Sequence, residues 1–65
     1  MLIIHVRKNE FSRVTRNSYT GDGHGPLALK AAKAHRVAGY QVACTVERLD
    51  TPSDDWATPN AQDWN

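Results

Sequence analysis

The sequence predicts an α+β fold: a small three-stranded antiparallel sheet, in the order strand, strand, helix, strand, packed against one helix. The most apolar run, at residues 2–7, is rich in branched side chains and has the length of a strand. An alanine-rich segment follows a glycine-rich loop, and a stretch of alternating apolar residues comes directly after it. Because 65 residues hold one domain at most, we place that domain at 1–50 and an acidic, tryptophan-containing C-terminal tail at 51–65.

The first two strands are expected at residues 2–7 and 11–16, joined by a turn at Asn9 and Glu10. Alternation along the first strand places Leu2, Ile4 and Val6 on one face of the sheet, and residues 3, 5 and 7 on the other. The second predicted strand is polar and charged. This composition suits a sheet edge, where charges discourage pairing with another molecule.

The helix is expected to begin at Pro26 and to end before Gly39, because proline suits a first helical turn and glycine a C-terminal cap. A helical wheel predicts a narrow apolar seam that lies close to the sheet, and a basic face opposite to it. The predicted seam consists of Leu27, Ala31, Ala34 and Ala38. The opposite face contains Lys30, Lys33 and Arg36, together with Val37.

The third strand is expected at residues 40–47, antiparallel to the first and beside it, so that the most apolar strand lies at the centre. Its inward side chains are expected to be Tyr40, Val42, Cys44 and Val46. The helix covers one face of such a sheet. The other face, which carries Ile3, His5 and Arg7, has no cover from the first 50 residues.

The tail repeats one phrase, Thr51-Pro52-Ser53-Asp54-Asp55-Trp56 and then Thr58-Pro59-Asn60-Ala61-Gln62-Asp63-Trp64. A Thr-Pro pair followed by acids predicts a short helical turn, and each turn holds a tryptophan. Burial of one tryptophan contributes up to about 5 kcal/mol, so we expect Trp56 to pack on the open sheet face and Trp64 to contact a partner. The candidate partner-binding residues are Trp56, Trp64, Asp54, Asp55 and Asp63.

The near-neutral net charge of +1 conceals an asymmetry. Residues 1–46 hold seven basic and two acidic side chains, a balance of +5, whereas residues 47–65 hold one basic and five acidic, a balance of −4. A basic body of this kind can bind phosphates, although a solvated helix face is the commoner meaning of a basic stripe. The candidate basic surface consists of Arg7, Lys8, Arg13, Arg16, Lys30, Lys33 and Arg36.

No arrangement of residues indicates catalysis, a cofactor or a metal. The glycine-rich loop at 21–25 lacks the Lys-Ser/Thr of a phosphate-binding loop and is interpreted as a flexible connection. The possible zinc ligands His5, His24, His35, Asp22 and Cys44 have no spacing typical of a ligand pair. A single cysteine excludes an internal disulfide, and no segment is apolar enough to span a membrane, so we expect a cytoplasmic protein. Because no catalytic arrangement is present, we expect that it is not an enzyme.

The layout resembles small phage-encoded proteins that disable host machinery, particularly anti-CRISPR proteins of type I systems. The resemblance lies in the apolar first strand, the basic helix ending Ala38-Gly39-Tyr40, the strand from Val42 to Leu49 and the short Asp/Trp tail. It implies a non-enzymatic inhibitor that binds a large protein or ribonucleoprotein complex in a bacterial host. The basic body differs from a strongly acidic DNA mimic.

We therefore expect a protein-binding inhibitor or adaptor of phage type. One alternative is a nucleic-acid-binding accessory protein that uses the basic sheet and helix surfaces. Another is a structural or cementing subunit of a larger assembly, with the tail as its strap. A homodimer formed through the polar edge of the sheet or through the uncovered face is compatible with each of these functions.

Overall fold

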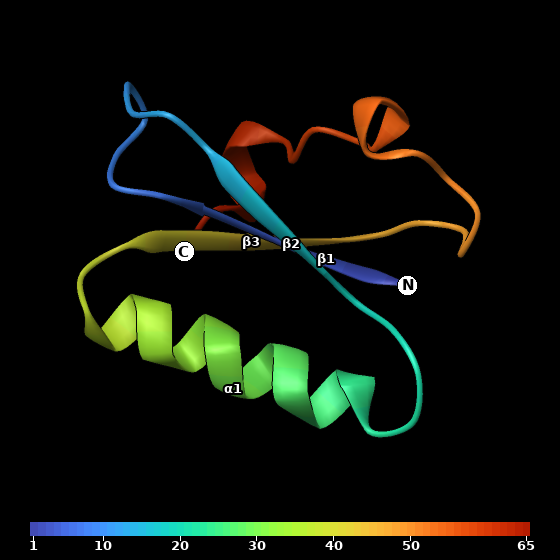
Figure 1. Ribbon diagram of the computed structural model, residues 1–65. Helices are drawn as coiled ribbons and strands as arrows, with labels where there is room; N and C mark the ends of the chain where they lie inside the picture. The colour runs from blue at the N-terminus through green and yellow to red at the C-terminus, as the bar shows by residue number, and fades with distance from the viewer.

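The computed structural model describes residues 1–65 and confirms the α+β fold (Figure 1). The strands are β1 (Leu2–Arg7), β2 (Thr15–Tyr19) and β3 (Gln41–Val46), and the helix α1 (His24–Val37) lies between β2 and β3 in the chain. Two single 3-10 turns follow, η1 (Ser53–Asp55) and η2 (Ala61–Asp63). The helix lies on one side of the sheet and the C-terminal segment with its two turns lies on the other, so the molecule has three layers (Figure 1).

The sheet has the order β2-β1-β3, and both pairings are antiparallel. The most apolar strand is therefore the central one, as the sequence predicts. The register places His5 of β1 between Arg16 of β2 and Ala43 of β3. Because side chains alternate along a strand, these three residues point to the face opposite α1, together with Ile3 and Thr45.

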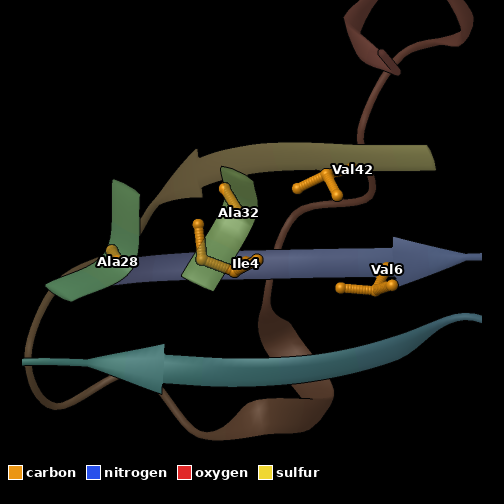
Figure 2. Close-up of a cluster of buried hydrophobic side chains, with 5 residues drawn as sticks. All are labelled: Ile4, Val6, Ala28, Ala32 and Val42. Carbon is orange, nitrogen blue, oxygen red and sulfur yellow. The ribbon is translucent and has the colours of Figure 1, made fainter. Parts of the chain in front are cut away.

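The core between the sheet and α1 is small and consists of Ile4, Val6, Ala28, Ala32 and Val42 (Figure 2). The predicted helical seam was wrong by one residue: Ala28 and Ala32 are buried, whereas Leu27 is 59% exposed and Ala34 and Ala38 are also exposed. Two alanines one turn apart let the helix backbone approach β1 closely. A leucine at the contact would hold the helix away from the sheet, so the smaller residues occupy it.

The predicted second strand at residues 11–16 was also wrong, because β2 spans Thr15–Tyr19. Asn9 organises the connection before it. Its side-chain oxygen accepts a hydrogen bond from the N–H of Phe11 at 2.8 Å, and its carbonyl accepts one from Ser12 at 3.1 Å. This local turn competes with strand formation and leaves Phe11 90% exposed.

The third strand is close to its predicted position, but of its four predicted inward side chains only Val42 is buried. Tyr40 precedes the strand, and Cys44 and Val46 are exposed because the narrow alanine face of α1 does not cover the far end of β3. Gly39 has φ +96° and ends the helix as predicted, since an L side chain is strained in that conformation.

Substitution of Ala32 by leucine tests the close approach of α1 to the sheet. We expect Ala32→Leu to lower the free energy of unfolding by about 1–3 kcal/mol, because the larger side chain does not fit between α1 and β1. Ala34→Leu, at an exposed position of the same helix, is the matched control and should change stability by less than about 0.5 kcal/mol. Urea unfolding followed by circular dichroism measures the stability of both variants. Equal stabilities of Ala32→Leu and Ala34→Leu would contradict the close packing of α1 on the sheet.

Candidate functional site

The C-terminal segment lies across the sheet face opposite α1 (Figure 1). We call this face of the sheet the tail face, and alternation along the strands places Ile3, His5, Ala43 and Thr45 on it. Pro59 is buried in this layer. Each repeated phrase forms a single turn followed directly by its tryptophan, since Trp56 follows η1 and Trp64 follows η2. The turns begin later than predicted, because Pro52 is extended and precedes η1 rather than opening it.

Hydrogen bonds hold this segment at both ends. Near its start, the Trp56 indole Nε1–H donates to the carbonyl of Thr51 at 3.1 Å, and the N–H of Ala57 donates to Glu47 Oε1 at 2.6 Å. At its end, Asn65 and Val42 exchange two backbone hydrogen bonds of 2.9 and 3.0 Å. Residue 65 thereby adds one strand-like residue to the outer edge of β3.

Trp64 is the centre of a polar and aromatic cluster on the tail face. The Arg7 guanidinium carbon lies 4.0 Å from the centre of the indole ring, a cation–π contact that contributes about 0.5–2 kcal/mol. Arg7 is held in place because its Nε–H donates to Gln41 Oε1 at 2.7 Å. The His5 ring meets Trp64 edge to face, with ring centres 6.3 Å apart.

His5 is the only fully buried titratable side chain. Its Nε2 lies 2.7 Å from Thr45 Oγ1, and its Nδ1 has no hydrogen-bond partner. Burial lowers the pKa of His5 below its usual value, the nearby Arg16 lowers it further, and Glu47 opposes the shift. The imidazole is therefore held neutral, because a second proton would place an unpaired charge in the layer between the sheet and Trp64.

The structure separates the acidic and basic candidate residues from one another. Asp54 and Asp55 are exposed in η1, and Asp63 accepts a hydrogen bond from the N–H of Asn60 at 3.1 Å. The only ion pair is the exposed contact between Arg48 and Asp50 at 3.7 Å. All seven residues of the candidate basic surface therefore lack a carboxylate partner: Arg7, Lys8, Arg13, Arg16, Lys30, Lys33 and Arg36.

The main surface feature, which the sequence indicated only at Val37, is a set of exposed apolar side chains. Only four large apolar side chains are buried, Ile3, Ile4, Val6 and Val42, whereas seven are exposed. The exposed ones are Phe11, Leu27, Leu29, Val37, Tyr40, Val46 and Leu49. At 100° per residue, Leu29 and Val37 fall within the same stripe of α1 as Lys30, Lys33 and Arg36. We call these five residues the outer surface of α1.

No three His, Cys, Asp or Glu side chains come together in a group that could hold a metal ion. Cys44 is exposed, and partial desolvation raises the pKa of its thiol while Arg36 opposes the shift. The one surface hollow is lined by Arg48, Leu49 and Asp50, and neither histidine nor cysteine is among its lining residues. The single α-helix is too short and too polar to cross a bilayer.

Removal of the Trp64 side chain tests the cluster on the tail face. Trp64→Ala should lower the free energy of unfolding by about 2 kcal/mol, since it removes apolar contact with the sheet together with the Arg7 cation–π contact. Phe11→Ala, which removes an aromatic ring that is almost fully exposed, is the control and should have little effect. Thermal unfolding of both variants measures the difference, and a Trp64→Ala protein as stable as the parent would contradict the docked tail.

The stability should also fall in acid because of His5. The pKa of His5 is lower in the folded than in the unfolded state, so its contribution is complete above the unfolded pKa and is lost as the pH falls toward the folded pKa. His5→Gln cannot titrate and should therefore lose less stability than the parent between about pH 7.5 and pH 5. Denaturant unfolding at both pH values measures the free energy of unfolding of the two proteins. An equal loss in the parent and in His5→Gln would show that His5 does not contribute to the pH dependence of stability.

No protein-family model, no curated protein and no solved structure matches this chain.

Proposed function

We propose that this protein is a non-enzymatic inhibitor or adaptor that binds another protein through the outer surface of α1. The observation that supports this proposal is the position of two exposed apolar side chains, Leu29 and Val37, among three cations that have no carboxylate partner. A surface that combines apolar area with unpaired arginine and lysine fits a partner surface with acidic residues around an apolar patch.

The small core supports the same proposal. A chain that buries four large apolar side chains and exposes seven keeps much of its apolar surface available for another molecule. Isolated surface leucines and valines are ordinary in proteins, but two of these belong to one helical stripe with both lysines and the arginine of α1. Burial of that stripe by a partner would remove apolar area from water and neutralise three charges at once.

The outer surface of α1 is a better contact than the tail in this conformation. A tail that acts as an anchor would first have to release its hydrogen bonds to Glu47 and Val42 and the contact between Trp64 and Arg7. The helix needs no such rearrangement. The resemblance to phage-encoded type I anti-CRISPR proteins supports a nucleic-acid-processing complex of a bacterial host as the partner.

A nucleic-acid-binding accessory protein is the second candidate. It is favoured by β2, in which Thr15, Arg16, Asn17 and Ser18 are all exposed, and by Lys8 and Arg13, which lie in the connection between β1 and β2 and have no carboxylate partner. Binding of this kind would weaken steeply with salt, because each neutralised phosphate releases a counterion.

The two candidates can be separated by affinity capture from a nuclease-treated bacterial lysate. The triple variant Lys30→Gln, Lys33→Gln and Arg36→Gln should recover about tenfold less of the captured complex than the parent, because it removes the cations of the outer surface. The double variant Asp54→Asn and Asp55→Asn neutralises charges in the tail and serves as the matched control. Equal capture by all three chains would contradict the α1 surface, and loss of all bound material after nuclease treatment would favour the nucleic-acid alternative.

A further inference from the structure

The outer edge of β3 has open backbone hydrogen-bonding groups at two residues. Met1 and Glu47 exchange backbone hydrogen bonds, so alternation along the antiparallel pair makes Ile3–Thr45, His5–Ala43 and Arg7–Gln41 the bonded pairs. The N–H and C=O groups of the even-numbered residues of β3 therefore point away from β1. Val42 uses both of its groups on Asn65, which leaves Cys44 and Val46 open.

The two edges of the sheet differ in composition. The edge strand β2 carries Arg16 and is otherwise polar, which discourages pairing with another strand. The edge strand β3 has no charged residue between Gln41 and Val46, and Val46 is 73% exposed beside its open backbone groups. An uncharged, apolar edge with unpaired backbone groups is the form of edge that accepts a further strand.

We propose that β3 pairs with β3 of a second copy of this chain, antiparallel about a two-fold axis at Val46, so that two three-stranded sheets join into one of six strands. The position of Asn65 determines this register. If the partner strand is shifted toward Val42, residues 47 and 48 of the partner collide with Asn65. If it is shifted away from Val42, the backbone groups of Cys44 have no partner.

In the Val46 register the partner strand pairs with the part of the β3 edge that Asn65 does not use. Val46 lies opposite Val46 of the second copy, and Cys44 lies opposite Arg48, whose N–H has no acceptor within its own chain. The partner then leaves the edge at residues 49 and 50, where the chain turns and the N–H of Thr51 bonds to the carbonyl of Arg48 at 3.0 Å. The extended part of the second copy therefore ends at residue 48, before the position opposite Val42 that Asn65 occupies.

The remaining features of the molecule are compatible with this pairing. A net charge of +1 gives little repulsion between two copies, and Arg48 is paired with Asp50 in its own chain. The two valines at the axis, exposed in the single chain, bury each other. The pairing uses the edge of β3 and not the outer surface of α1, so it holds or fails independently of the proposed function.

Sedimentation velocity of the full chain at a concentration on the order of 100 µM tests the pairing, because a strand-edge interface of this size is expected to be of modest affinity. The parent chain should sediment with twice the mass of one chain. Val46→Lys places a charge at the axis and should return it to the mass of one chain, while Phe11→Lys, at a similarly exposed apolar position away from β3, should remain a dimer. A parent chain that stays monomeric, or a Val46→Lys variant that stays dimeric, would overturn the proposal.

A cysteine at the axis tests the register itself. Directly opposed residues of a bonded antiparallel pair have Cα atoms about 5.5 Å apart, which suits a disulfide. In a Cys44→Ala background, Val46→Cys should form a disulfide-linked dimer under mild oxidation. Leu49→Cys in the same background is the control, because Leu49 is as exposed as Val46. At roughly 3.3 Å per residue, the Cα atoms of residue 49 in the two copies would lie about 20 Å apart, so this variant should form no disulfide. Equal crosslinking of the two variants would show that the register is wrong.

Discussion

Burial of β1 on both faces is the constraint on which the rest of the structure depends. Ile4 and Val6 pack against α1, while Ile3 and His5 are buried beneath the tail, so one six-residue strand supplies the centre of both layers. In a three-stranded sheet with a single helix, the helix covers only one face of the central strand. The tail layer, with Pro59 buried and Trp64 on Arg7, is therefore part of the fold, and a chain this small has little stability to spare without it.

The histidine at the centre of that strand shows how the two layers are coupled. His5 points away from α1, is bonded on one side to Thr45 and meets the Trp64 ring in a T-shaped contact. Its Nδ1 is buried without a partner, which has a cost that the surrounding apolar contacts must offset. Any event that separates the tail from the sheet would expose this ring to water, so tail docking and the protonation of His5 are linked.

The sequence was sufficient to predict the fold class, the central position of the apolar strand and the cap at Gly39, because these follow from branched-residue runs and from the special conformation of glycine. It was insufficient where side-chain size or local hydrogen bonding decided the outcome. Apolar content favoured Leu27 for the helix contact, but close approach to the sheet selected Ala28 and Ala32. Asn9 formed a local turn and moved β2 by several residues. The helical wheel predicted that Val37 lies away from the sheet, whereas the exposure of Leu29 was known only from the packing of α1.

Both tryptophans of the chain lie in the tail, one after each 3-10 turn, and none lies in the core beneath α1. Indole emission from this protein consequently reports the environment of the tail and is insensitive to the packing of α1 on the sheet. A solution in which the fluorescence maximum shifts to longer wavelength while the helical circular dichroism is retained would contain molecules with an undocked tail and an intact core. The repeated phrase at the end of the chain thus provides a built-in optical probe of one layer of the fold.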